Sequence, residues 1–372
     1  MYRIYLNSLP LHHPNLDVEG RVVLDPALDE AVNTQGSLAF AVPASNPEWA
    51  NVIPRTAYIT VKDDTGQIWR GRVISTERVW NNSKAVQCEG ELAFLKDSVF
   101  RPFVFRGTPG ELLALVIASH NQQVDAERQF ALGTVTVTDP NDYILRSSET
   151  AKKSWDALMD SLVESSLGGY IRARTVGDIH YIDYLADFEE EAAQPVKFAE
   201  NLLDLVQTEN ASEIATCLIP YGAQFEDDDP NHEDEPQNGP WDGNRLTIRS
   251  VNNGLDYVEN AAGVERWGRV FASETWDDIT LAANLKTAAE QQLAALVASQ
   301  ITLEINAADL SLIDGEIAPI RVGQYVRTIS GPHDLNTRLL CRQKHTDMSA
   351  PDQTSITLGA GIKTLTDLYK GE

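Results

Sequence analysis

The sequence predicts a β-rich α+β protein made of several domains. Hairpin-forming strands dominate the first hundred residues, and strands of similar length return after residue 300. Amphipathic helices occur between these two ends of the chain. The 372 residues, 42% hydrophobic and 23% charged, have the composition of a folded globular protein, and at about 100–200 residues per domain they correspond to two to four domains.

The first hundred residues predict a small β unit. Turns rich in Asp, Asn and Gly separate the strand-like runs and suit hairpin connections. The runs occupy residues 57–62, 67–74, 75–80 and 84–89. Gly71, inside the second run, predicts a bulge that bends the sheet toward closure. We therefore expect a first β-barrel-like domain over residues 1–103, completed by a returning segment at about 200–225.

Residues 104–198 predict an inserted α+β domain. Thr108, Pro109 and Glu111 have the spacing of a capping box with proline at the first helical position. The apolar residues expected on one face of this first helix are Leu112, Leu115 and Val116. A second helix carries apolar residues at helical spacing, namely Trp155, Leu158, Met159, Leu162 and Val163. A hairpin follows at residues 170–174 and 179–184.

The remainder predicts a smaller α/β segment, residues 226–300, and a second β-barrel-like domain, residues 301–372. Residues 216–220 and 246–251 resemble isolated strands on either side of an acidic stretch. A helix before residue 300 has one apolar stripe, made of Leu281, Leu285, Ala289, Leu293, Leu296 and Val297. Period-two alternation then returns in the final strands, at residues 301–305, 322–330, 338–346 and 353–358.

The charge balance excludes several classes of function. Lys and Arg number 30 against 55 Asp and Glu, which gives a formal net charge of −25. Binding to nucleic acids and to anionic membranes depends on clustered basic residues, so neither is expected. The N-terminus lacks the pattern of a signal peptide, and no apolar run approaches the ~20 residues of a membrane span. We expect a protein that is made in the cytosol and is soluble there.

The densest charged feature is the sequence EDDDPNHEDE at residues 226–235, which contains seven carboxylates, one His and neither Lys nor Arg. Clustered oxygen ligands are what Ca²⁺ requires, but the spacing of a calcium-binding loop is absent, Pro230 interrupts the run and Pro236 follows it. A solvated loop is the favoured interpretation.

No catalytic, cofactor-binding or metal-binding residue is predicted. Cys88, Cys217 and Cys341 are far apart and are expected to be buried thiols. The seven histidines show none of the usual metal-binding or catalytic spacings, and nucleotide-binding glycine motifs are absent. Acidic residues that could supply a glycosidase-like carboxylate pair are Asp139, Asp142, Asp156 and Asp160, but such pairs arise by chance in an acidic protein.

Several stretches of the sequence together carry a family resemblance. The N-terminal stretches are GSLAFAVPASNPEW (36–49), IWRGRVISTER (68–78), VQCEGELAFLKDS (86–98), FRGTPGELLALVIASHN (105–121), LGTVTVTDPNDYILRSS (132–148) and SWDALMDSLVESSLGGYIR (154–172). The C-terminal stretches are NLLDLVQTENASEIATCLIPYGA (201–223), RLTIRSVNNGLDYVENAAGVERWGRV (245–270) and DLSLIDGEIAPIRVGQYVRTIS (309–330). In this order they resemble the tail-hub family of long-tailed phages, which is also labelled prophage endopeptidase tail or tail-associated lysin, N-terminal region.

The resemblance implies a baseplate-hub-like fold and a structural role at the tail tip of the virion, with assembly in the host cytoplasm. Two barrel-like domains per subunit in a homotrimer would give a pseudo-sixfold ring on a hexameric tail tube. The implied partners are the distal tail protein or tail tube, the tape measure protein and tip or fibre proteins, with DNA passing through the lumen unbound. Direct membrane binding and cofactors are not expected.

The resemblance also bears on enzymatic activity. The endopeptidase label belongs to a C-terminal extension of some relatives, and this chain ends at Glu372, so no hydrolase activity is expected. The alternatives are a tail-associated cell-wall hydrolase and a receptor- or carbohydrate-binding tail module. For the second alternative, Trp241 is one candidate for an exposed aromatic platform.

Overall fold

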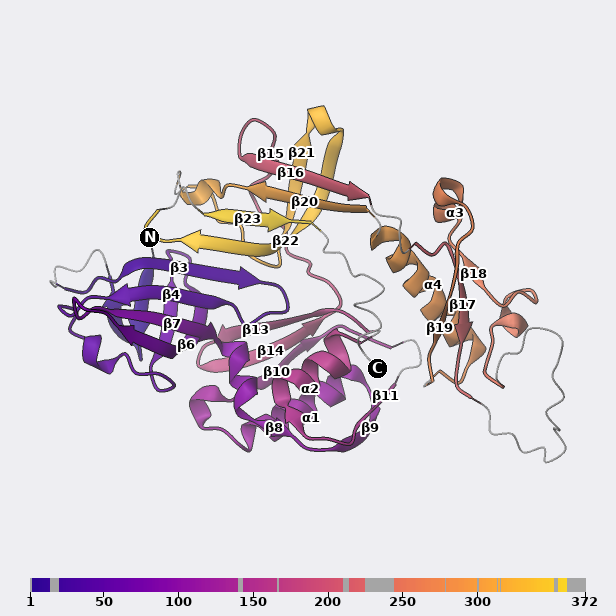
Figure 1. The fold of residues 1–372 in the computed structure, drawn as a ribbon, viewed down its shortest axis with the longest axis horizontal. Coiled ribbons are helices and arrows are strands. Elements are labelled where there is room, and N and C mark those ends of the chain that lie inside the picture. Colours follow the sequence, from indigo (N-terminus) through magenta and orange to yellow (C-terminus); the bar gives the residue numbers. More distant parts are fainter. Residues whose placement is uncertain are drawn as a thin grey trace.

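One large curled sheet organises the molecule (Figure 1). The computed structural model describes residues 2–13, 20–139, 143–165, 167–209, 214–224, 244–277, 279–299, 301–312, 314, 316–350 and 354–359. Within them, thirteen strands form this sheet, whose main path runs β16-β20-β23-β22-β3-β4-β7-β6-β5-β1-β2. The β-rich α+β class predicted from the sequence is confirmed.

The two ends of the chain share this sheet. The N-terminal strands are β1 (Arg3–Leu6), β2 (Leu9–His12), β3 (Leu24–Ala31), β4 (Ser37–Val42), β5 (Tyr58–Lys62), β6 (Gln67–Arg78) and β7 (Lys84–Gly90). The C-terminal strands are β15 (Val196–Lys197), β16 (Leu202–Glu209), β20 (Ile301–Ala307), β21 (Tyr325–Ser330), β22 (Leu335–Asp347) and β23 (Ser355–Leu358). The two groups join where β3 pairs antiparallel with β22, with Ala31 opposite Gln343 and Ala27 opposite Asp347. Sequence reasoning did not foresee that the two β units form one continuous sheet.

Each end nevertheless has its own core. Ile4, Leu28 and Val61 belong to the N-terminal core, whereas Ile305 and Val326 belong to the C-terminal one. The segment expected to return at about 200–225 supplies β16 to the C-terminal end of the sheet, against β20. It also supplies β17 to a separate small sheet.

Two details of the N-terminal strands differ from the prediction. The runs at 67–74 and 75–80 form the single strand β6, and the β6–β7 register shifts between Val73 and Ser75 rather than at Gly71. Gly71 is required for a different reason. A Cβ there would lie 2.2 Å from the carbonyl oxygen of Glu89 and 2.4 Å from the ring of Trp69, closer than atoms can approach.

The insertion packs helices against short strands, below the large sheet in Figure 1. A 3-10 segment (Glu91–Asp97) and β8 (Val99–Phe100) lead into it, and its first half contains β9 (Phe103–Gly107), α1 (Pro109–Asn121), a 3-10 turn (Ala126–Arg128) and β10 (Ala131–Val135). Its second half contains β11 (Ile144–Ser148), β12 (Lys152–Lys153), α2 (Ser154–Leu158), β13 (Tyr170–Val176) and β14 (Ile179–Leu185). α2 continues into a π-helical turn, Met159–Val163, and all five apolar residues predicted for this helix are buried.

The predicted capping box of α1 is confirmed. The Thr108 hydroxyl accepts from the Glu111 amide at 3.2 Å, and the Glu111 carboxylate accepts from the Thr108 amide at 2.8 Å. The predicted apolar face is partly wrong, because Leu115 is 44% exposed. Leu112 and Val116 are buried as predicted, and so are Leu113 and Ile117. The buried face is wider than predicted because α1 contacts β10 as well as α2.

Thr108→Ala is expected to lower the free energy of unfolding by about 1 kcal/mol, because it leaves an amide at the start of α1 without its acceptor. Urea unfolding followed by circular dichroism measures the change. Thr150→Ala is the matched control, since Thr150 is exposed and lies outside any helix start; it should change stability by less than ~0.5 kcal/mol. Equal effects of the two substitutions would contradict the assigned role of the cap.

A third group of elements stands to one side of the sheet (Figure 1). It contains β17 (Cys217–Tyr221), β18 (Val258–Glu259), α3 (Ala261–Trp267), β19 (Phe271–Thr275) and α4 (Ala282–Ser299). α4 packs on this small sheet through Leu285, Ala289, Leu293 and Leu296. Leu281 was wrongly assigned to the buried stripe, because it precedes α4 and is 60% exposed.

The prediction of a strand at residues 246–251 is also wrong. Leu246 makes backbone hydrogen bonds to Gly222 and Ala223, but residues Arg249–Val251 form a 3-10 turn. Asn253 and Gly254 follow with positive φ values of 56° and 83°, so the chain reverses before a strand can extend. Among the described residues, no helix has the length and apolarity needed to cross a membrane.

Candidate functional site

The cysteines lie where a reactive thiol would be shielded. Cys88, Cys217 and Cys341 are free and at most 3% exposed, as the sequence predicted. Burial raises the pKa of the Cys341 thiol to about 12 and also raises those of Cys88 and Cys217. A neutral, enclosed thiol is a poor nucleophile, so the three side chains serve packing.

The structure does not assemble a glycosidase-like carboxylate pair from the described acids. Asp156 and Asp160 line one open groove of about 590 Å³, but both are exposed and Asp160 pairs with Lys152 at 2.6 Å. Such chemistry requires one desolvated, protonated acid beside an ionised one. Asp139 is half-buried and does not line this groove, and Asp142 lies outside the described residues. So do the acidic loop 226–235 and Trp241.

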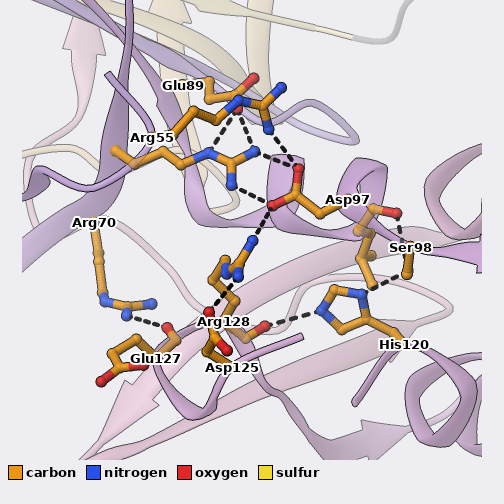
Figure 2. A network of polar contacts seen from close by, with 11 residues as sticks. Arg55, Arg70, Glu89, Asp97, Ser98, His120, Asp125, Glu127 and Arg128 are labelled. Atoms are coloured by element: carbon orange, nitrogen blue, oxygen red, sulfur yellow. Dashed lines mark hydrogen bonds and ion pairs between the residues drawn. The ribbon is translucent and has the colours of Figure 1, made fainter. Parts of the chain in front are cut away.

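No group of three or more His, Cys, Asp or Glu side chains suited to hold a metal ion occurs in the part of the chain that the structure describes. The most concentrated chemistry is instead a buried ionic network between the N-terminal strands and the insertion (Figure 2). At its centre is Arg72 of β6, which is 1% exposed. Sequence periodicity could not identify this residue, because Gly71, Arg72 and Val73 are all buried in succession.

Asp97 receives three guanidinium groups. Its carboxylate lies 2.6 Å from Arg55 and 3.0 Å from Arg128, and it forms a bidentate pair with Arg72. Arg72 also donates to Glu89 at 2.7 and 2.9 Å. Burial alone would raise the pKa of Asp97, but the hydrogen bonds from Arg72 and Arg128 outweigh it and lower the pKa to about 2.

The network is electrically balanced. Arg128 also binds Asp125 at 2.6 Å, so Arg55, Arg72 and Arg128 face the three acids Glu89, Asp97 and Asp125. Buried charges are tolerated when they are paired and hydrogen-bonded in this way. The network ties β6 and β7 to the turn that follows α1.

A Ser–His pair lies next to this network and superficially resembles a catalytic dyad. Ser98 Oγ is 2.7 Å from His120 Nδ1 and 2.6 Å from Ser154 Oγ. His120 Nε2 is 2.9 Å from the carbonyl oxygen of Arg128. A carbonyl only accepts, so Nε2 carries the hydrogen and Nδ1 accepts from Ser98. All three side chains have 0% exposure, so no substrate reaches them and the pair is structural.

A second buried pair holds the C-terminal part of the sheet. Lys344 on β22 is 2% exposed, and its Nζ lies 2.6 Å from Asp309 and 2.7 Å from the carbonyl oxygen of Ile320. Asp309 also accepts from the Gln194 side chain at 2.7 Å and from the amides of Ser311 and Ile320. Burial would raise the pKa of Asp309, but Lys344 and these donors lower it. Arg321 extends the junction toward the N-terminal strands by pairing with Asp63.

Residues 191–369 match the sequence profile of a family described as Prophage endopeptidase tail. No curated protein sequence matches the chain. A tail protein from Neisseria meningitidis MC58 is similar in structure, with a TM-score of 0.60 and 11% identity, over 99% of this chain and 98% of that one.

Two further solved structures are similar over most of their length. The prophage MuSo2 43 kDa tail protein from Shewanella oneidensis has a TM-score of 0.58 and 10% identity, over 96% of this chain and 97% of that one. The prophage tail protein gp18 from Listeria monocytogenes EGD-e has a TM-score of 0.55 and 12% identity, over 93% and 91%. At these identities the likeness establishes the fold alone.

Proposed function

We propose that the chain is a phage tail protein that acts as a structural hub of the tail tip, because residues 191–369 match the profile of the prophage endopeptidase tail family. In this proposal three copies form a ring that joins the tail tube, through the distal tail protein, to tip or fibre proteins. The tape measure protein and then the DNA pass through its centre. The family match carries the proposal.

The fold supports a hub. The N-terminal and C-terminal strands have separate cores but one continuous sheet, so each chain presents two β units in a fixed relation. We propose that these units act as the two barrel-like domains of each subunit. Three chains would then place six similar β units around one axis, which suits contact with a sixfold tube.

The negative net charge of the chain supports a role of the proposed ring as a channel for DNA. Three copies would carry about −75 in total, since each carries −25. Proteins that bind DNA gain affinity when their Lys and Arg side chains contact phosphates and release the counterions condensed there. An acidic channel would repel the duplex, so DNA would cross the ring without adhering to it.

We propose that the chain has no hydrolase activity. The described thiols and the Ser98–His120 pair are buried, and the groove beside Asp156 lacks a desolvated acid. No observation in the described residues favours a cell-wall hydrolase or a carbohydrate-binding module over the hub.

Mass photometry and electron microscopy test the hub directly. Purified protein mixed with tail tubes is expected to give a threefold ring of about 123 kDa, three times the 41.1 kDa chain, at one end of each tube. A ring of another symmetry, or binding along the side of the tube, would contradict the proposed role. A threefold ring whose channel is lined by Lys and Arg would retain the hub but reject the acidic conduit.

A further inference from the structure

A cavity lies where the N-terminal strands, the insertion and the C-terminal strands meet. It has a volume of about 240 Å³ and is lined by β3 and the turn after it, by β6, by β13, and by Phe188 and Arg321. A single buried water needs only roughly 10–15 Å³ measured in the same way. The cavity is therefore large enough for a small molecule.

One wall of the cavity carries a hydrogen-bond donor without a partner. Trp69 is 7% exposed, and its Nε1 makes no hydrogen bond to any described residue. Space beside this nitrogen depends on glycine, because a Cβ on Gly36 or on Gly90 would lie 3.3 Å from it. Buried N–H groups are normally paired, so this one indicates an acceptor that a ligand could supply.

Arg172, another residue of the cavity lining, carries a second such donor. Its terminal nitrogens bind Asp183 at 3.2 Å and Glu190 at 3.3 Å. Its Nε is buried and has no partner among the described residues. The cavity lining therefore includes two N–H donors without a partner among the described residues, and a carboxylate carries two oxygens that accept such hydrogen bonds.

Glu30 adds a carboxyl group, a hydrogen-bond acceptor, to a cavity lining whose other unpaired groups are N–H donors. It lines the same cavity, is half-buried, and makes no hydrogen bond or ion pair through its side chain within the described residues. Burial raises the pKa of this carboxyl group. The nearby cations already have partners, since Lys344 pairs with Asp309 and Arg321 pairs with Asp63.

The remaining charges of the lining are also paired. Arg70 binds Glu91 at 3.0 Å and the carbonyl oxygen of Glu127 at 2.6 Å. A simple anion would bind the two N–H groups but face the Glu30 carboxylate, whereas a simple cation would leave both N–H groups unbonded. A molecule that carries both charges satisfies each group.

We propose that this cavity binds a small zwitterion of the α-amino acid class, with its carboxylate on Trp69 Nε1 and Arg172 Nε and its ammonium group on Glu30. The ligand would bridge three parts of the fold and so fix their relative positions. The proposal stands independently of the hub assignment, because it concerns a site within one chain.

Isothermal titration calorimetry of the full chain tests the proposal with glycine, acetate and methylammonium as separate probes. Glycine is expected to bind in the millimolar range. Acetate and methylammonium each lack one charged hydrogen-bonding group, so each should bind about 10-fold to 100-fold more weakly. Glycine should also raise the melting temperature of the protein.

Two substitutions locate the site. Trp69→Phe removes the N–H and retains a ring, and Glu30→Gln removes the charge with little change in size; each should weaken glycine binding about 10-fold. The matched controls are Trp49→Phe, whose Nε1 donates to Asn82 at 2.9 Å, and the exposed Glu77→Gln. Neither control residue lines the cavity, so both should leave binding unchanged.

Three outcomes would overturn the proposal. Equal binding of acetate and glycine would mean that the cavity takes an anion alone. Equal effects of the cavity and control substitutions would place glycine elsewhere on the molecule. Absence of glycine binding in the millimolar range would mean that water alone occupies the cavity. Glu30→Gln removes a half-buried carboxylate that has no side-chain partner among the described residues, so this variant should fold and the test does not depend on the Trp69 variant.

Discussion

Asp97→Ala is expected to lower the free energy of unfolding by about 3–5 kcal/mol. The substitution leaves the guanidinium of Arg72, which is 1% exposed, with Glu89 as its one carboxylate partner among the residues that the structure describes. Removing one member of a buried ionic group is costly because the charge that remains has already lost its hydration. Guanidinium chloride or urea unfolding, monitored by tryptophan fluorescence, measures this loss.

The matched control for this variant is Asp125→Ala. Asp125 belongs to the same network and binds Arg128, but its side chain is 79% exposed. An exposed pair of this kind contributes about 0–1 kcal/mol. Equal losses for the two variants would show that burial of the network is not what makes Asp97 important.

The same network predicts an acid response. Asp97 has its pKa lowered in the folded protein from 3.8 to about 2. A depressed pKa stabilises the fold above the unfolded value, and this stabilisation is lost as the pH falls from about 4 to 2. The lost stabilisation is about 2 kcal/mol, so the stability difference between the native chain and the Asp97→Ala variant should narrow over that range.

Lys344→Met is expected to cost a comparable ~3–5 kcal/mol, because it leaves the fully buried Asp309 carboxylate without its cation. Adding Asp309→Asn should restore part of the loss, since the amide oxygen still accepts hydrogen bonds and carries no charge. Urea unfolding of the single and double variants measures both effects.

The control for Lys344 is its neighbour His345, which pairs with Asp29 at 2.7 Å with 38% and 51% of the two side chains exposed. His345→Gln should cost at most ~1 kcal/mol. In the Lys344→Met variant, burial of Asp309 without a cation should raise its pKa above the unfolded value. That variant should therefore recover stability relative to the native chain as the pH falls toward 4, and a deficit that does not change with pH would contradict this account.

Local signals in the sequence predicted local structure well. The capping box of Thr108 and Glu111 and the hairpin of β13 and β14 depend only on residues close in sequence, and both are present. Leu281 was misassigned because periodicity places residues on a helical face but does not fix where the helix begins. The strand predicted at residues 246–251 failed because a neighbouring turn overrides β propensity.

Features that depend on contacts between distant parts of the chain could not be predicted from the sequence in the same way. Arg72 is buried because the 3-10 segment Glu91–Asp97 packs beside β6, with the Arg72 guanidinium over the Phe94 ring and paired with Asp97. Period-two alternation along a strand carries no information about such a covering segment. The cavity beside Trp69 likewise brings together residues from β3, β6, β13 and the segment before β21. Such sites depend on the packing of separate parts of the chain, which single-sequence patterns do not encode.

The pairing of β3 with β22 has a consequence for biosynthesis. Asp29 and His345 meet across this ladder although 316 positions separate them in sequence. At about 5–20 residues per second, a ribosome needs roughly 15–60 seconds to make the intervening chain. During that time β4 covers one side of β3 and the other side offers unpaired backbone groups. An open strand edge is a template for pairing with other chains, so we expect the nascent protein to be prone to aggregation until β22 has been made.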